Sequence, residues 1–356
     1  MDFDQVAVNG VNSNHIKNGG VIMASTIRDV AARAGLSVGT VSKYINGKTV
    51  KESTRLAIEE AIKELDFHPN NIAKGLRNAK SFSVAILLPM LDSTFCTSMI
   101  SSIESTLLPL GYSVIVCECH NNAEMELRKT QYLIDRMVDG IVLIPYASDG
   151  KQIEMIQKSN IPLILLDQEI KDHATDCIVL DNELAGFEST QRLIDLGHKD
   201  IAIITGSPNH YNSVGRLNGY KKAMTEAGLT LCDDYIQCGD YSIDGGYEAM
   251  LRLCKLKKRP TAIFISNYDM TIGAYLAINY LRLKIPEDIS VIGFDNFPLA
   301  NVVNPPLSFA EQPTNLMGTE AGKLLYKRIC GDYSDYPKTI MHKPTMHYKE
   351  SIRQLV

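Results

Sequence analysis

One stretch near the N-terminus, Thr26–Asn46 (T-I-R-D-V-A-A-R-A-G-L-S-V-G-T-V-S-K-Y-I-N), constrains this chain more than any other. Its first residues place apolar side chains at the i, i+3, i+4 spacing that buries one face of a short helix. Gly35 supplies the backbone freedom of a tight turn, and Ser37 can cap a second helix whose Val41 and Ile45 face inward. Two short helices joined by such a turn form a helix-turn-helix, whose second helix enters the DNA major groove. The alternative is a small helical hairpin without a partner.

The same stretch matches a family pattern, T-I-x-D-V-A-x-x-A-G-x-S-x-x-T-V-S-(R/K)-x-x-N, along its whole length. The chain closely resembles the lactose-repressor/galactose-repressor (LacI/GalR) family of bacterial transcription regulators. The resemblance continues through Glu52–Arg77 and on to about Arg353. It implies a small all-α helix-turn-helix headpiece followed by an α/β core like that of the periplasmic sugar-binding proteins, with two doubly wound parallel-sheet subdomains.

Length and composition agree with a globular protein of two or three domains. The chain has 356 residues, 45% of them hydrophobic and 22% charged. We find no apolar run near the ~18 residues of a membrane span and no signal segment. Eight cysteines lack C-x-x-C and zinc-finger spacing, and Cys117 and Cys119, two apart, should face one side of a strand as small buried thiols. We therefore expect reduced cysteines, a cytoplasmic location and neither a cofactor nor a metal.

The charge distribution is uneven. The net charge is −5, which by itself argues against nucleic acid. Residues 23–80, however, hold ten Lys and Arg against six Asp and Glu, whereas residues 81–356 hold twenty-five against thirty-three. A basic head on an acidic body suits a protein that contacts phosphates with one end only.

Residues 1–22 show no periodicity and are expected to be a disordered extension. Gly19-Gly20 can be encoded as a ribosome-binding sequence a short distance before Met23. We therefore hypothesise that translation starts at Met23, the alternative being a real flexible tail. Mass spectrometry of the native protein tests this, because peptides from residues 2–22 would contradict it.

Residues 23–68 are expected to form the headpiece, completed by a third helix over Glu52–Leu65. Ser53 or Thr54 can cap that helix, and His68-Pro69 ends it because the residue before proline avoids the helical region. Its expected apolar stripe consists of Leu56, Ile58, Ala61, Ile62 and Leu65.

Residues 69–80 are expected to form a hinge or linker. Asn70–Asn78 (N-N-I-A-K-G-L-R-N) has the pattern of a short basic helix that is too short to be stable alone. The resemblance implies a hinge helix that folds on DNA, contacts it through Asn70 and Lys74, and wedges Leu76 into the minor groove, which bends the duplex. Gly75 lowers helix propensity, so we expect a hinge that depends on DNA for its order. The alternative is a plain linker.

Residues 81–356 are expected to form the core, because near-continuous apolar runs alternate with amphipathic helices. We expect one subdomain from about residues 81–180 and 311–340, and a second from about 181–310 and the C-terminal end. The expected strands are 83–88, 112–117, 140–144, 162–166, 200–205, 262–266 and 289–293. The expected helices are 96–110, 124–137, 151–158, 183–196, 216–227, 245–256 and 271–283. The chain is expected to cross back near Pro305–Pro313, which places residues 315–330 on the first subdomain.

Ligand-contacting residues should lie at the carboxyl ends of these strands. The candidates are Phe95, Asp167, His210, Asn212, Arg216, Tyr241, Asn267 and Asp295. The resemblance implies effector contacts for Arg216 in G-R-L-N-G-Y and for Asp295 in V-I-G-F-D-N. Charged groups that bind vicinal hydroxyls beside an aromatic floor suit a sugar.

Each of these candidates has an ordinary alternative. Asp295 could only cap a turn, Arg216 could only pair with it, and His210 could be solvated. The family commonly has Asn-Asp where this chain has Asn267-Tyr268, which puts the identity of the sugar in doubt.

The resemblance also places DNA contacts. Val38, Gly39 and Lys43 are expected to face bases, Val38 against a thymine methyl and Lys43 toward guanine, while Gly39 offers no side chain. The expected phosphate contacts, which position without specifying sequence, are Thr26, Thr40, Ser42 and Asn46.

The sequence therefore predicts a transcriptional regulator, with repressor favoured by resemblance, that binds a pseudo-palindromic operator as a homodimer. A sugar or sugar phosphate in the cleft is expected to control it. The alternative is a cytoplasmic sugar-binding receptor without operator specificity. An enzyme is disfavoured, because G-x-G-x-x-G after a strand, H-E-x-x-H and a P-loop are missing from the sequence. His342 and His347, five apart on one expected late strand, have poor spacing for a metal.

Overall fold

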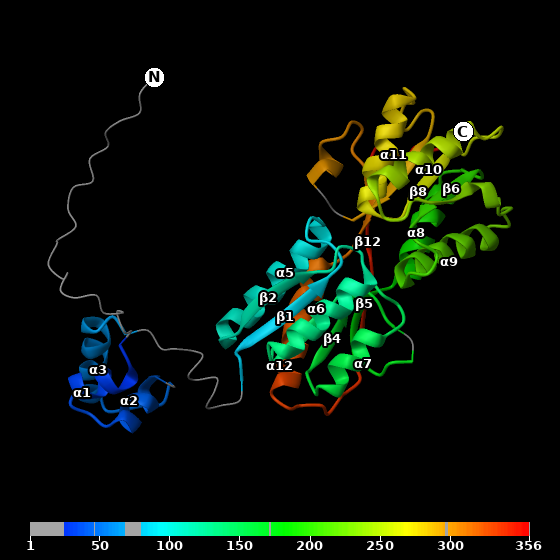
Figure 1. Cartoon of the computed structure of the whole chain (residues 1–356). Coiled ribbons are helices and arrows are strands. Elements are labelled where there is room, and N and C mark those ends of the chain that lie inside the picture. The colour runs from blue at the N-terminus through cyan, green and yellow to red at the C-terminus, as the bar shows by residue number, and fades with distance from the viewer. Residues whose placement is uncertain (1–24, 46, 68–79, 171, 296–297, 356) are drawn as a thin grey trace, which may run out of the picture. The chain divides into compact units, whose positions relative to one another are not determined.

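The computed structural model describes residues 25–45, 47–67, 80–170, 172–295 and 298–355. They belong to two compact units, one ending at Lys74 and the other beginning at Gly75 (Figure 1). The expected extension 1–22 and the expected hinge, apart from its last residue Lys80, lie outside the described residues.

The first unit is a helix-turn-helix followed by a third helix: α1 (Ile27–Arg33), α2 (Val38–Ile45) and α3 (Glu52–Glu64). Thr26 and Asp29 form a reciprocal cap at the start of α1, in which the carboxylate accepts from the Thr26 amide at 2.7 Å. The Ser37 hydroxyl accepts from the Thr40 amide at 3.2 Å, as the sequence predicts for the start of α2. The described residues of this unit thus confirm the expected headpiece.

Two details of α3 differ from expectation. Leu56 is 53% exposed, whereas Ile58 is fully buried in the small core shared by the three helices. Two residues span about 200° around a helix, so Leu56 faces away from the side that Ile58 occupies. The predicted caps Ser53 and Thr54 lie inside the helix, and the capping position is Lys51, whose side chain makes no cap hydrogen bond.

The first sheet of the second unit has the strand order β11-β5-β4-β3-β1-β2, and every neighbouring pair is parallel. Its helices cover both faces: α5 and α12 pack on one, α6 and α7 on the other. We call this sheet with its four helices the first subdomain. Its strands are β1 (Ser83–Leu88), β2 (Ser113–Glu118), β3 (Gly140–Leu143), β4 (Leu163–Leu166), β5 (Asp176–Leu180) and β11 (Thr339–His342). Its helices are α5 (Thr94–Leu107), α6 (Ala123–Asp135), α7 (Lys151–Lys158) and α12 (Thr314–Ile329), with a 3₁₀ turn, η1 (Leu108–Leu110), after α5.

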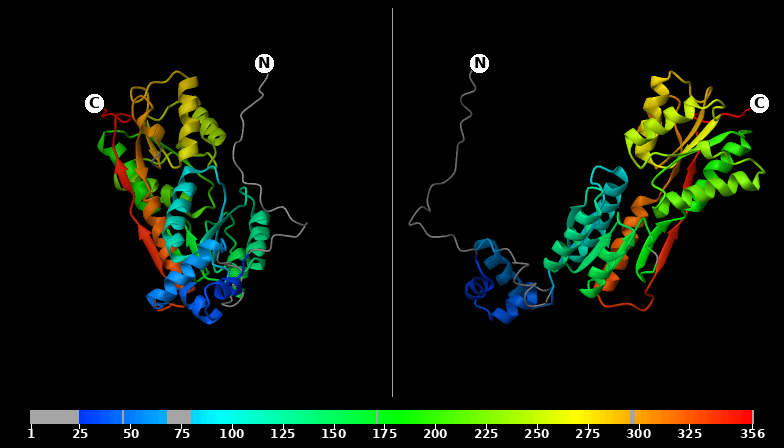
Figure 2. Two further views of the ribbon diagram at one scale, coloured as in Figure 1. Left: turned by 90° about the vertical axis from the view of Figure 1, so that its left-hand side faces the viewer. Right: turned by 45° about the vertical axis from the view of Figure 1, so that its right-hand side comes forward.

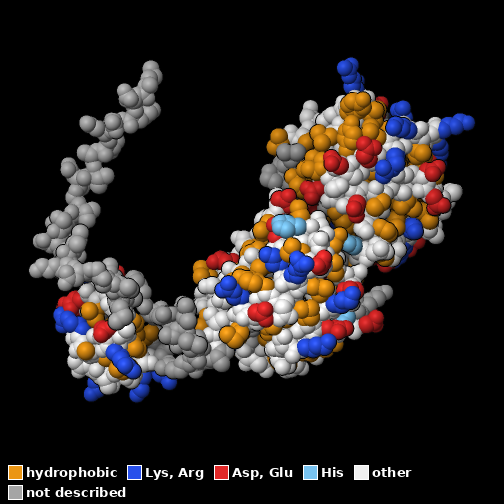
Figure 3. Space-filling view, in the orientation of Figure 1, with side chains coloured by type: hydrophobic (Ala, Val, Ile, Leu, Met, Phe, Trp, Pro, Cys, Tyr) orange, Lys and Arg blue, Asp and Glu red, His pale blue; other side chains and the backbone are white. Residues whose placement is uncertain are grey.

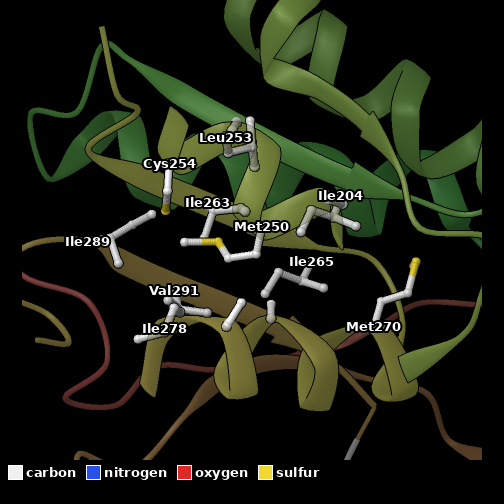
Figure 4. Packing of buried hydrophobic residues seen from close by; sticks show 14 of the residues in the cluster. Ile204, Met250, Leu253, Cys254, Ile263, Ile265, Met270, Ile278, Ile289 and Val291 are labelled. Atoms are coloured by element: carbon white, nitrogen blue, oxygen red, sulfur yellow. The ribbon is translucent and has the colours of Figure 1, made fainter. Parts of the chain in front are cut away.

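The second sheet has the order β12-β10-β9-β8-β6-β7, parallel except that β12 runs antiparallel to β10. Helices α8 and α9 pack on one face, α10 and α11 on the other; Figure 4 shows the second of these cores, with Met250 and Ile263 at its centre. We call this the second subdomain. Its strands are β6 (Ile201–Thr205), β7 (Ile236–Cys238), β8 (Ala262–Ile265), β9 (Ser290–Phe294), β10 (Ser308–Glu311) and β12 (Thr345–His347). Its helices are α8 (Asn182–Asp195), α9 (Tyr211–Glu226), α10 (Ile243–Lys255) and α11 (Tyr268–Tyr280), with 3₁₀ turns η2 (Asp233–Tyr235) and η3 (Pro298–Asn301).

The chain passes between the two subdomains three times: from β5 to α8, from β10 to α12, and from β11 to β12 (Figure 2). Three short strands were missed by the sequence pattern, namely β5, β7 and β10, and the one late strand expected at His342 and His347 is two strands, β11 and β12. Of these, β7 and β12 have only three residues each, and β11 is partly exposed, so they lack the buried apolar run that identifies a strand. The two doubly wound sheets confirm the expected fold class.

The start of α9 differs from expectation. This helix begins at Tyr211, five residues before the expected start at Arg216. Asn212 and Arg216 are therefore one turn apart on the same face of a helix, and Arg216 lies in its second turn.

A buried ion pair fastens α12 to β5. Arg328 donates through Nε and Nη2 to the two carboxylate oxygens of Asp176, at 2.6 and 2.9 Å. Both side chains are almost completely buried, and Asp176 also accepts from the Lys338 amide at 2.8 Å. This bidentate contact holds the last helix of the first subdomain to β5, the strand next to the edge of its sheet.

Candidate functional site

A cavity of about 250 Å³ lies at the carboxyl ends of the strands of both sheets. Its walls come from both subdomains, which is where doubly wound folds place their ligands. The eight candidates named from the sequence all line it: Phe95, Asp167, His210, Asn212, Arg216, Tyr241, Asn267 and Asp295. The structure thus brings together residues that are up to 200 positions apart in the chain.

Arg216 is held rigidly at the back of the cavity. Its Nε donates to Asn182 Oδ1 at 2.8 Å and its Nη1 donates to the Ser266 carbonyl at 2.5 Å. The guanidinium carbon lies 3.6 Å from the centre of the Phe294 ring. Within the described residues, Arg216 makes no ion pair with Asp295, so pairing with that aspartate does not account for its position.

Asp167 follows β4 and contacts the other subdomain. The Asn212 amide nitrogen donates to its Oδ2 at 2.7 Å, and Asn182 in turn donates to Asn212 Oδ1 at 3.1 Å. The other carboxylate oxygen, Oδ1, is buried without a hydrogen-bond partner among the described residues. Burial raises the pKa of Asp167 to about 6, although Arg216 and the hydrogen bond from Asn212 act in the opposite direction.

Asp295 follows β9 and contacts Gln312, a residue that the sequence pattern did not reveal. Gln312 donates from Nε2 to Asp295 Oδ1 at 2.7 Å, and its own Oε1 is buried without a partner in the described part of the chain. Burial raises the pKa of Asp295, with Arg216 and Gln312 opposing the rise. Gln312 stands immediately before Pro313, where the chain leaves the second sheet, and this crossing is the signal that could have identified it.

An aromatic group lines another side of the cavity. Tyr146 meets His210 edge-on at 5.8 Å between ring centroids, and His210 stacks on Tyr241 at 5.6 Å. His210 is therefore packed rather than solvated, and burial lowers its pKa. The Tyr241 ring lies directly against Gly206, where an added Cβ would come within 2.1 Å of it. Phe95, in the first turn of α5, is the remaining aromatic candidate.

Asn267 serves first as a structural residue. Its Oδ1 accepts from the Met270 amide at 3.0 Å and so caps α11, and the residue also lines the cavity. Other wall residues that the sequence pattern did not reveal include Gln168, Ser207, Asp240 and Asp269. Gln168, Ser207 and Asp240 lie in loops after strands and Asp269 lies in the first turn of α11, where position along the chain alone does not show which side chain turns inward.

In the first unit, the residues expected to face bases are exposed: Val38, Gly39 and Lys43, all on α2. Of the expected phosphate contacts, Thr26 is bonded to Asp29 and Thr40 to Ser37, while Ser42 is partly buried on α2. The remaining expected DNA contacts, Asn46, Asn70, Lys74 and Leu76, lie outside the described residues.

His342 and His347 do not share a strand, contrary to expectation. His342 ends β11 in the first sheet and lies 2.7 Å from Glu320, whereas His347 ends β12 in the second sheet and lies 2.5 Å from Glu311. The Lys343-Pro344 step between them carries the chain from one sheet to the other. Throughout the described ranges we find no cluster of side chains suited to a metal ion. None of the described helices is long and apolar enough to cross a membrane.

Comparisons with known proteins agree with this architecture. Residues 26–70 match the family model of bacterial regulatory proteins of the lacI family. Residues 81–355 match the model of periplasmic binding proteins and the sugar binding domain of the LacI family. The chain belongs to the LacI family. It is a DNA-binding transcriptional regulator.

Individual LacI-family relatives cover almost the whole chain. Catabolite control protein A of Priestia megaterium is 34% identical over 86% of this chain and 92% of its own. The ribose operon repressor of Escherichia coli K12 is 34% identical over 86% of this chain and 93% of its own. Among solved structures, the complex of the transcriptional regulator CelR with cellobiose has a TM-score of 0.72 and 29% identity over 92% of this chain and 99% of its own.

Proposed function

We propose that this LacI-family regulator represses transcription by binding a two-fold symmetric operator as a homodimer, controlled by a small carbohydrate, a sugar or a sugar phosphate, in the cavity. One observation carries the proposal. A helix-turn-helix with an exposed second helix belongs to the same chain as a polar, aromatic-lined cavity that contains an arginine and two buried carboxylates. Relatives named for a ribose operon and for a complex with cellobiose support the class of ligand. The regulator would act in the cytoplasm, where its DNA lies, and the proposal includes no catalytic step.

For the DNA contacts, we propose that Val38 packs against a thymine methyl and that Lys43 donates to guanine. Gly39 offers no side chain, so this regulator would read fewer bases than one with a larger residue there. Thr26, Thr40 and Ser42 would bind phosphates, with Asn46, Asn70, Lys74 and Leu76 remaining predictions of the resemblance.

For control, we propose that a ligand links the two subdomains. Asp167 of the first subdomain already bonds Asn212 of the second, and Tyr146 of the first meets His210 of the second. A ligand that bonds to both walls favours one relative arrangement of the subdomains over another. In a dimer, this changes how the first subdomains pack and how the hinges present Leu76 to the DNA.

The test is selection of bound duplexes from a randomised DNA pool by the purified full chain, repeated with pooled sugars and sugar phosphates. We expect a two-fold symmetric consensus with a flexible pyrimidine–purine step at its centre. Failure to enrich any sequence under either condition would refute operator recognition. Enrichment that is indifferent to every added compound would refute control by a carbohydrate.

A further inference from the structure

The wall of the cavity is strongly acidic. Among the residues that line it, all within the described chain, four are aspartates: Asp167, Asp240, Asp269 and Asp295. Arg216 is the only arginine or lysine among them. On the face drawn in Figure 3, acidic side chains also lie where the first and second subdomains meet. A ligand with negative charge would therefore meet repulsion from most of the charged groups around it.

The single arginine has only part of its guanidinium free to offset this repulsion. An arginine binds phosphate or carboxylate best through two parallel N–H groups on one edge of its guanidinium. Two of the five N–H groups of Arg216 are engaged, because Nε donates to Asn182 and Nη1 donates to the Ser266 carbonyl. The edge that contains Nε therefore cannot form a bidentate pair, and one positive charge is set against four aspartates in the wall.

The unpartnered polar atoms of the cavity wall, within the described residues, are two acceptors and the hydroxyl of Tyr241, which can donate or accept. Oδ1 of Asp167 and Oε1 of Gln312 are both buried and lack a hydrogen-bond partner in the described part of the chain. A buried acceptor left without a donor is unfavourable, so each requires an O–H or N–H group from the ligand. A sugar hydroxyl provides one, whereas the oxygens of a phosphate near neutral pH are mostly ionised and only accept.

Three of the described helices begin at the cavity, α5 after Ser93, α9 after His210 and α11 after Asn267, and the last of them adds to this effect. The N-terminus of a helix attracts anions, and α11 begins at the cavity with Asn267 as its cap. Its first turn, however, contains Asp269, whose pKa is raised by burial and by the nearby carboxylates of Asp92 and Asp295. The positive end of this helix dipole is therefore offset by a carboxylate of the protein itself.

We propose that the cavity selects a carbohydrate that carries no negative charge and excludes phosphorylated and acidic sugars. This inference rests on the proposed function and narrows its effector. Two buried acceptors accept hydrogen bonds from hydroxyl groups of the ligand. The negative charges of four aspartates repel anionic derivatives of the same sugar.

The experiment compares matched ligands on the purified full chain. A thermal-shift panel of uncharged mono- and disaccharides identifies binders, and calorimetry then compares each binder with its phosphate ester, as with glucose and glucose 6-phosphate or ribose and ribose 5-phosphate. We expect the phosphorylated member to bind at least about 100-fold more weakly. A phosphorylated or acidic sugar that binds as tightly as its uncharged partner would overturn the inference, and so would the failure of every uncharged sugar to bind.

A charge variant tests the cause of the selectivity. In Asp269→Asn, the preference for the uncharged over the phosphorylated sugar should fall about tenfold. Asp244→Asn is the matched control, since Asp244 lies exposed in the first turn of α10 and does not line the cavity. An equal change in both variants, or none in either, would contradict the role given to Asp269.

Operator binding separates this inference from the proposed function. If a phosphorylated sugar alters operator affinity and the uncharged sugar does not, control by an effector stands and the charge selectivity fails. If the chain selects no DNA but binds uncharged sugars, the selectivity stands and the proposed function fails.

Discussion

Asn212 on α9 donates a hydrogen bond of 2.7 Å to Asp167, so a side chain of the second subdomain is bonded to a buried carboxylate of the first. The bond lies at one side of the cavity, and only one of the two carboxylate oxygens takes part in it. The protein thus keeps a desolvated aspartate that is incompletely paired. Such a residue lowers the stability of the free protein, and we propose that it contributes to ligand binding.

Replacing Asp167 should separate these two effects. The pKa of Asp167 is raised to about 6 in the folded protein, above the ordinary value of 3.8. The folded state therefore binds the proton of the Asp167 carboxyl more tightly than the unfolded chain does. Ionisation of Asp167 above pH 6 lowers the free energy of unfolding by up to about 3 kcal/mol. We expect Asp167→Asn to unfold at a higher urea concentration than the wild type at pH 7.5. The difference in unfolding urea concentration between the variant and the wild type should shrink as the pH falls from 6 toward 4, because the wild-type carboxyl becomes protonated.

The same variant should bind sugar more weakly. Asparagine keeps an oxygen for Asn212 but loses the charge that strengthens hydrogen bonds from ligand hydroxyls. Calorimetry with a sugar found in the thermal-shift panel measures this loss. A variant that is less stable at pH 7.5, or that binds sugar as well as the wild type, would contradict the role assigned to Asp167.

Loss of the buried ion pair between α12 and β5 should be severe. Arg328→Ala leaves Asp176 as an uncompensated buried charge, and we expect a loss of about 3–5 kcal/mol in the free energy of unfolding. Arg128→Ala is the control. Arg128 pairs with Glu124 at 2.7 Å, but both side chains are mostly exposed, so its loss should cost less than about 1 kcal/mol. Urea denaturation of both variants checks this, and similar losses would show that burial is not the cause.

Lys43→Ala tests base recognition by α2. We expect affinity for the selected operator to fall by ~1–3 kcal/mol, with little change on unrelated DNA. Lys63→Ala, on α3, is the control, and it should change neither the affinity for the operator nor the affinity for unrelated DNA markedly. Gel-shift titrations on both duplexes give the result, and an equal loss on operator and unrelated DNA would assign Lys43 to the phosphates instead.

Gly206→Ala tests the position of the Tyr241 ring. An added Cβ would come within 2.1 Å of this ring, so the ring has to move and the stack with His210 is disturbed. We expect sugar affinity to fall at least about tenfold while operator binding without sugar persists. Gly39→Ala is the control for sugar affinity alone, because its nearest neighbouring atom is 3.8 Å away and it lies on α2, outside the cavity wall. Unchanged sugar affinity in Gly206→Ala would mean that Tyr241 does not form part of the binding surface.

Much of the fold could be predicted because it depends on local patterns. The cap formed by Ser37 and the long buried strands such as β1 have clear signals in a few consecutive residues. Leu56 shows where this reasoning fails. Its spacing within a loose apolar stripe predicted burial, but the helix turns it away from the core, and only the packing of three helices decides which stripe is covered.

The sequence by itself determined the helix-turn-helix, the two doubly wound sheets and the eight residues expected at the cavity, because parallel strands place their carboxyl ends at one edge. The tertiary structure decided how those residues interact. It placed Arg216 against Asn182 and Ser266 rather than against Asp295, and added Gln312 and Tyr146 to the walls. It also separated His342 from His347 by a crossing between sheets. These contacts join residues far apart in the chain, and their geometry depends on how the subdomains pack, which local sequence patterns do not encode.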